Sequence, residues 1–159
     1  MKSRNENGFT LVEMMIILVI IAILGALAVP NMNRVFSKNK LRASTTSVTS
    51  SLYLARMKAI NEGEPYGVEF FGDGSYHILK DPYGAGEVFG NPYHLDDEIS
   101  FQEITFVSQL AVFNEYGQLH KNCLPAGEST GLVKISDGLA DTTMVQVTFI
   151  SGRIRETNR

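Results

Sequence analysis

The chain has 159 residues, of which 44% are hydrophobic and 19% charged, and its net charge is -3. This length accommodates one domain, or one small domain with an appendage, and the composition is that of a globular chain rather than a disordered one. The negative charge excludes general binding to nucleic acid. A single cysteine, Cys123, excludes an internal disulfide and any metal site built from several cysteines.

The hydrophobic residues are concentrated in one block near the N-terminus. No residue from Met14 to Val29 is polar, and over residues 9–29 the only charge is that of Glu13. As a helix, these residues span about 31 Å, which matches the hydrocarbon core of a bilayer. Lys2 and Arg4 precede the block. They predict that the N-terminus stays in the cytoplasm while the rest of the chain crosses the membrane.

Two simple interpretations of this block are a secretory signal peptide, cleaved after Ala28, and a plain signal anchor. Neither explains Glu13, because a carboxylate in a membrane helix costs up to about 2.5–3.5 kcal/mol at mid-bilayer. The stretch Gly8–Glu13, with the sequence GFTLVE followed at once by the apolar run, resembles the class III signal of type IV pilins and type II secretion pseudopilins.

This resemblance implies that residues 1–8 are a leader peptide. A prepilin peptidase would cut between Gly8 and Phe9 on the cytoplasmic side of the membrane and methylate Phe9. Glu13 would then pair with the N-terminal amine of a neighbouring subunit and set the register of assembly, since unpaired charge in an apolar setting is costly. The alternative is that Glu13 only reaches the membrane interface.

An amphipathic stretch follows over residues 30–63. Pro30 and Gly25 predict a kink, and Gly63 is expected to cap the helix end near Asn61. One long helix is therefore predicted from Phe9 to Asn61. One side of its second half is basic, includes Arg56 and is expected to be solvated. The opposite side carries an apolar stripe that is expected to face a core, formed by Leu41, Thr45, Val48, Leu52, Ala55 and Ala59.

The remaining residues, 64–159, read as a β-rich globular head. Short runs of strand-forming residues alternate with turn signals such as Gly72–Ser75, which predicts a hairpin. The fold class is therefore α+β, with a long N-terminal helix packed on antiparallel sheets, and the resemblance implies the pilin fold. Strands are expected at residues 68–70, 76–79, 99–101, 104–107, 111–113, 132–135, 144–149 and 153–155.

Two further motifs narrow the resemblance. Leu54–Ile60, with the sequence LARMKAI, and Ser151–Arg155, with the sequence SGRIR, are similar to signatures of the GspH/FimT group of minor pilins and pseudopilins. Lone Cys123 cannot form the C-terminal cysteine pair that major pilins usually carry. These features favour a minor subunit.

No set of residues predicts catalysis, a metal site or a cofactor. His77, His94 and His120 are far apart in sequence, and the acidic residues after His94 are expected to form a solvated loop. A nucleophile pair of Cys123 and His120 lacks any supporting motif, so a buried or idle thiol is expected.

The C-terminal arginines raise an alternative function. On a strand, Arg153 and Arg155 point to one face, with Ile154 on the other, and Arg159 adds a third guanidinium. This cluster could bind DNA phosphates, as in the DNA-binding minor pilins that the Gly-Arg-x-Arg element resembles. It could also be charge that protects an edge strand from pairing.

The sequence therefore predicts a non-enzymatic minor pilin or pseudopilin, anchored by one span in the inner membrane with its head in the periplasm, and later part of a filament. Its expected partners are other pilin or pseudopilin subunits, the prepilin peptidase, an inner-membrane assembly platform and membrane lipid. A type II secretion pseudopilus and a type IV pilus both remain open. The rival from another class is a signal-anchored periplasmic enzyme.

Overall fold

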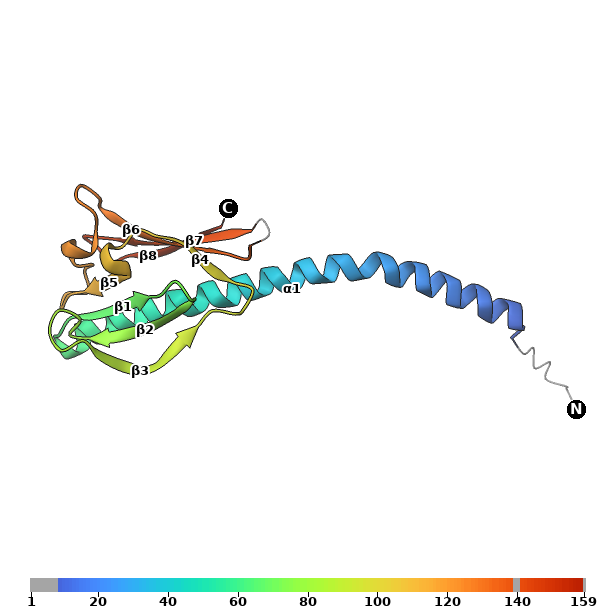
Figure 1. Cartoon of the computed structure of the whole chain (residues 1–159), viewed down its shortest axis with the longest axis horizontal. Coiled ribbons are helices and arrows are strands. Elements are labelled where there is room, and N and C mark those ends of the chain that lie inside the picture. Colours follow the sequence, from blue (N-terminus) through green and yellow to red (C-terminus); the bar gives the residue numbers. More distant parts are fainter. Residues whose placement is uncertain (1–8, 139–140, 159) are drawn as a thin grey trace, which may run out of the picture. The chain divides into compact units, whose positions relative to one another are not determined.

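The computed structural model describes residues 9–138 and 141–158. These residues form two compact units, one ending at Phe36 and the other beginning at Ser37. One long helix, α1 (Leu11–Glu62), is followed in this part of the chain by strands and two short 3-10 helices (Figure 1).

Helix α1 agrees with the single helix predicted from the sequence. It begins at Leu11 rather than Phe9 and runs through Pro30 to Glu62. Gly63 follows with φ +67°, and its N–H donates to the carbonyl oxygen of Ala59 at 3.0 Å, which is the predicted left-handed cap. The kink expected at Gly25 and Pro30 stays a prediction.

The first unit contains the apolar start of α1. Every side chain from residue 9 to residue 26 is exposed. No helix in the described part of the chain is long and apolar enough to span a membrane.

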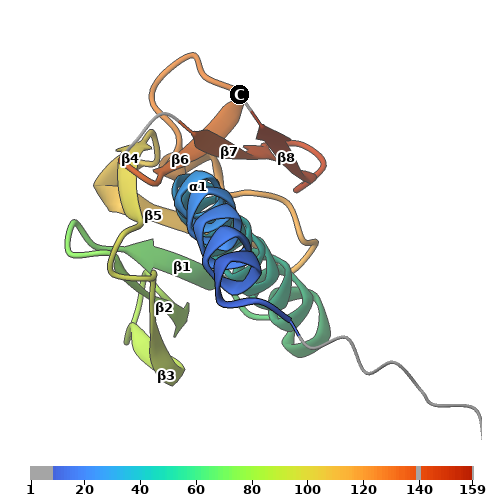
Figure 2. The same ribbon diagram turned by 90° about the vertical axis from the view of Figure 1, so that its right-hand side faces the viewer.

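The second unit holds two four-stranded antiparallel sheets. The part of α1 that belongs to this unit, residues 37–62, runs beside both sheets (Figure 2). The first sheet has the order β3-β2-β1-β5, and the second has the order β4-β6-β7-β8. The strands are β1 (Tyr66–Phe70), β2 (Ser75–Lys80), β3 (Glu87–His94), β4 (Ser100–Ile104), β5 (Leu110–Phe113), β6 (Thr130–Ser136), β7 (Thr142–Thr148) and β8 (Ile154–Asn158), and the 3-10 helices are η1 (Val107–Gln109) and η2 (Lys121–Cys123).

One hydrophobic core joins the helix to both sheets. The predicted stripe from Leu41 to Ala59 is confirmed, because all six of its side chains are buried. The first sheet contributes residues such as Phe70 and Ile78, and the second contributes residues such as Val133 and Val145. The predicted α+β fold, a long helix packed on antiparallel sheets, is thereby confirmed.

Two predictions about the strands were wrong. Strand β3 was missed, because Gly90 and Pro92 are typical of a loop. The strand tolerates them because β3 is the edge of its sheet, where a proline removes no ladder hydrogen bond. The strand expected at residues 104–107 is absent. Strand β4 ends at Ile104, and the chain then turns through Ser108, which has φ +55°.

Candidate functional site

The N-terminal end of α1 carries the residues predicted for processing and assembly. The backbone N–H of Glu13 donates to the Thr10 hydroxyl oxygen at 3.2 Å, and the N–H of Met14 donates to the Thr10 carbonyl at 3.2 Å. Thr10 is therefore the N-cap of the helix, and Glu13 occupies the third helical position. Phe9 is exposed directly before the cap, whereas Gly8 lies outside the described residues.

The side chain of Glu13 is exposed within the first turn of α1. A carboxylate at this position interacts favourably with the positive end of the helix dipole. The sequence prediction missed the capping role of Thr10, although the spacing Thr-x-x-Glu was a signal for it. The same carboxylate thus has a local role in the helix in addition to the pairing predicted for it.

The structure brings the two minor-pilin signature motifs together. Arg56, in the first motif, donates from Nε to the carbonyl oxygen of Gly117 at 2.9 Å and from its terminal nitrogen to the carbonyl oxygen of Ser151 at 3.0 Å. Ser151 opens the second motif. The prediction that Arg56 lies on a solvated face was wrong, because its guanidinium donates to backbone carbonyls and links α1 to two loops.

Two glycines allow this close approach. Gly117 has φ +71° and Gly152 has φ +57°, conformations that other residues adopt at a cost. A Cβ atom on Gly152 would overlap the carbonyl oxygen of Gly117 and lie 3.0 Å from Nε of Arg56. Arg56, Gly117, Ser151 and Gly152 together form what we call the arginine junction.

The C-terminal arginines lie beside this junction in sequence. Arg153 and Arg155 are exposed, and Ile154 between them is buried, which is the alternation predicted for a strand. Among the described strands β8 is last in the order of its sheet, next to β7, so it is a sheet edge. The Tyr53 hydroxyl donates to the carbonyl oxygen of Ile154 at 3.2 Å. Arg159, the third predicted member, lies outside the described residues.

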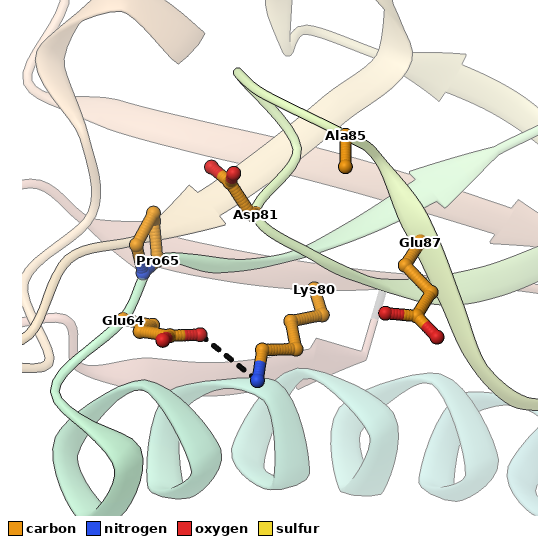
Figure 3. A pocket seen from close by; sticks show the side chains of 6 residues that line it. All are labelled: Glu64, Pro65, Lys80, Asp81, Ala85 and Glu87. Atoms are coloured by element: carbon orange, nitrogen blue, oxygen red, sulfur yellow. Dashed lines mark ion pairs between the residues drawn. The ribbon is translucent and has the colours of Figure 1, made fainter.

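A cavity of about 400 Å³ opens where the end of α1 meets β2 and β3, and a hollow of about 300 Å³ adjoins it. Figure 3 shows Lys80 at the centre of the larger cavity, paired with Glu64 at 2.9 Å. Carboxylates outnumber the lysine in this lining, so the cavity does not favour an anion. Its lining residues are Glu64, Pro65, Lys80, Asp81, Ala85 and Glu87.

The carboxylate of Glu62 lies beside this cavity in a network of hydrogen bonds. It accepts from the Tyr66 hydroxyl at 2.6 Å and from Nζ of Lys58 at 2.9 Å. The Tyr66 bond, followed by that from Lys58, lowers the pKa of Glu62 to about 2. Burial and the nearby carboxylate raise the pKa of Tyr66 to about 12. These groups hold the helix end against the sheet.

The histidines and the cysteine do not form a reactive group. Nε2 of His77 lies 3.1 Å from a carboxylate oxygen of Glu69 on the neighbouring strand. His94 ends β3, so its predicted place in a loop was wrong, although it is exposed as expected. Within residues 9–138 and 141–158, no three His, Cys, Asp or Glu side chains are grouped to hold a metal ion.

Cys123 is buried, as predicted. Its Sγ lies 3.1 Å from the Tyr83 hydroxyl, which in turn lies 3.3 Å from Nδ1 of His120. Tyr83 therefore stands between the two residues of the suspected nucleophile pair. Burial raises the pKa of the Cys123 thiol. A thiol that stays protonated is a poor nucleophile.

The N-terminal motif is similar to that of a known family. A family model for the prokaryotic N-terminal methylation motif matches residues 3–29. This match confirms the methylation motif that the resemblance of residues 8–13 predicted, and in this chain the motif leads into one helix packed on antiparallel sheets. No curated protein matches the sequence in a search.

Solved structures with this fold include two minor subunits. The minor pseudopilin EpsH from the type 2 secretion system of Vibrio cholerae aligns with a TM-score of 0.57 and 15% identity, covering 75% of this chain and 97% of EpsH. The type IV minor pilin FimU of Pseudomonas aeruginosa aligns with a TM-score of 0.56 and 11% identity, covering 74% and 92%. At these identities the likeness establishes the fold.

Proposed function

We propose that the protein is a minor pilin or pseudopilin. It is a non-enzymatic subunit that assembles into a type II secretion pseudopilus or a type IV pilus and supports protein secretion or pilus assembly. The observation that carries this proposal is that the methylation motif of residues 3–29 includes the start of α1, and that every residue of the helix from 11 to 26 is exposed. Such an apolar surface is stable only when covered, first by lipid and then by other subunits.

In this proposal the prepilin peptidase cuts between Gly8 and Phe9 and methylates Phe9. The apolar start of α1 then holds the protein in the inner membrane, with the head in the periplasm, until the assembly platform adds it to the filament. Mass spectrometry of the mature protein tests this step. A chain that starts at methylated Phe9 supports the proposal. A start at Val29 refutes it and favours the signal-peptide interpretation and a periplasmic enzyme.

Glu13 sets the register of assembly by pairing with the methylated amine of a neighbouring subunit. Its exposed carboxylate lies four residues from Phe9, at the same helix end, which supports this role. The alanine variant Glu13→Ala should insert into the membrane normally but lose filament incorporation, measured in sheared filament fractions.

Thr10→Ala is the matched control for this experiment. Loss of a Thr cap costs a helix about 1 kcal/mol, and removing a first-turn carboxylate costs a similar or smaller amount. If the role of Glu13 were only to stabilise the helix end, both variants would lose incorporation equally. Such a result would exclude the pairing with a neighbouring amine.

DNA binding for uptake is a second candidate function. It is favoured by Arg153, directly before β8, and Arg155, within β8, which are both exposed and have no carboxylate within 4 Å among the described residues. A gel shift with the full chain in detergent tests this function, comparing Arg153→Ala/Arg155→Ala with Lys121→Ala/Lys134→Ala. The absence of a salt-sensitive shift for the unaltered protein would exclude it.

A further inference from the structure

Part of α1 within the head leaves apolar side chains uncovered. Tyr53, Met57 and Ile60 recur at intervals of four and three residues, so they share one side of the helix, next to the buried stripe. Their exposed fractions are 42%, 58% and 47%. These values contrast with Leu52 and Ala59, which are fully buried on the same helix.

Two loops add further apolar side chains to this side of the helix. Tyr116 is 74% exposed and precedes Gly117, while Ile150 is 73% exposed and precedes Ser151. The carbonyl groups of Gly117 and Ser151 are the two acceptors of Arg56. The arginine junction therefore holds both loop tips beside the exposed helix side. We call the set Tyr53, Met57, Ile60, Tyr116 and Ile150 the junction surface.

The charges around the junction surface indicate what covers it. Lys58 and Lys80, at the same end of α1 as this surface, each have a carboxylate within 3.5 Å. Arg153 and Arg155, which flank the Ile154 carbonyl that Tyr53 contacts, have no such partner in the part of the chain that the structure describes. A docked partner that presents carboxylates would form ion pairs with these two arginines.

We propose that the junction surface docks a different subunit of the same filament, one that carries the N-terminal methylation motif and presents apolar side chains with carboxylates at their rim. This inference rests on the proposed function. Tyr, Met and Arg are the residues that protein interfaces favour, whereas an interface with DNA is more polar and more strongly cationic than five apolar side chains. The two acidic residues at this end of α1, Glu62 and Glu64, already pair with Lys58 and Lys80 of this chain, so the proposal assigns the carboxylates that Arg153 and Arg155 lack to the docked subunit.

The test uses the full chain in its native cell, with a photo-cross-linking amino acid at position 57 or position 116. Val88, which is 46% exposed on the edge strand β3, provides the control position. We expect positions 57 and 116 to form an adduct with another methylation-motif subunit, identified by mass spectrometry, and position 88 to form much less. Equal yields at position 88, an adduct of two copies of this chain, or an adduct with nucleic acid would each overturn the inference.

Charge reversal at Arg153 and Arg155 tests whether these arginines pair with carboxylates at the rim of the docked subunit. The double variant Arg153→Glu/Arg155→Glu should reduce the adduct about tenfold, a loss typical of broken interfacial charge pairs. The control Lys121→Glu/Lys134→Glu should leave it unchanged, and an equal loss in both variants would contradict the proposed rim.

Methylated Phe9 and recovery in sheared filaments, measured in the same cells, separate the two proposals. If both are normal and the adduct is absent, only the docking inference fails. If both are absent, the proposed function fails and the inference fails with it.

Discussion

Replacing Gly152 with alanine tests the arginine junction. At φ +57° an L-residue costs about 1–2 kcal/mol more than glycine. The new Cβ would overlap the carbonyl oxygen of Gly117, so that carbonyl must move away from Arg56. The hydrogen bond to a charged group that is then lost contributes about 1.5–3 kcal/mol, and its partly exposed position favours the lower value. We therefore expect a total loss of about 2.5–3.5 kcal/mol in the free energy of unfolding.

Gly86→Ala is the matched control. Gly86 has a similar φ of +61°, but no atom lies within 4 Å of the position that a Cβ would occupy. This variant should lose only the conformational part, about 1–2 kcal/mol. Urea unfolding of the full chain in detergent, followed by tyrosine fluorescence, measures both losses, since the chain has six tyrosines and no tryptophan.

Measuring Gly152→Ala in the background Arg56→Met separates two effects, the overlap of the new Cβ with the Gly117 carbonyl oxygen and the loss of the hydrogen bonds that Arg56 donates. If the Cβ acts partly by displacing the acceptor of Arg56, Gly152→Ala should cost about 1.5 kcal/mol less in this background than in the unaltered protein. Equal losses for Gly152→Ala and Gly86→Ala in the unaltered protein would refute the reasoning, because they would mean that the junction adds nothing beyond backbone conformation.

Three further predictions concern the core, the Glu62 network and the thiol. Leu52→Ala should lower the free energy of unfolding by about 2–5 kcal/mol in the same urea assay, whereas Met57→Ala, on the exposed side of the helix, should change it by at most about 0.5 kcal/mol. The folded pKa of Glu62 is lowered to about 2, so its stabilisation is present above its ordinary value near 4.5 and is lost as the pH falls towards 2. In Glu62→Gln, urea unfolding measured against pH should therefore show a weaker acid dependence in that range, and an unchanged slope would contradict the assignment. Cys123 should react with iodoacetamide at an appreciable rate only after denaturation, as mass spectrometry can follow, because it is buried and its pKa is raised.

The helix and its buried face were predictable from the sequence because their signals are local. Residues spaced by three and four from Leu41 to Ala59 specify one face, and Gly63 supplies the left-handed conformation that ends the helix. Strand β3 was not predictable in this way. Gly90 and Pro92 disfavour a strand locally, and only the position of β3 at a sheet edge makes them acceptable.

In the candidate site too, features that depend on neighbouring residues were predictable from the sequence, whereas contacts between distant residues were not. The role proposed for Glu13 depends on residues directly beside it in sequence, and the cap formed by Thr10 was readable from the same spacing. The contacts of Arg56 were not readable, because its acceptors are backbone carbonyls, and carbonyls at Gly117 and Ser151 leave no mark in the sequence. Lys58, two residues on, is ion-paired with Glu62, so spacing alone could not single out Arg56.

The arginine junction also changes what the signature motifs imply. Arg56 in the first motif and Gly152 in the second meet at Gly117, so a single structural contact accounts for a residue in each. A contact that builds the head is equally useful in a secretion pseudopilus and in a pilus, so the motifs cannot separate the two machines. The discriminating information lies in the side chains that the junction presents, Tyr116 and Ile150, because an exposed side chain is selected by the partner that covers it. Identifying the chain that contacts these two residues would therefore assign the machine more directly than the signature motifs do.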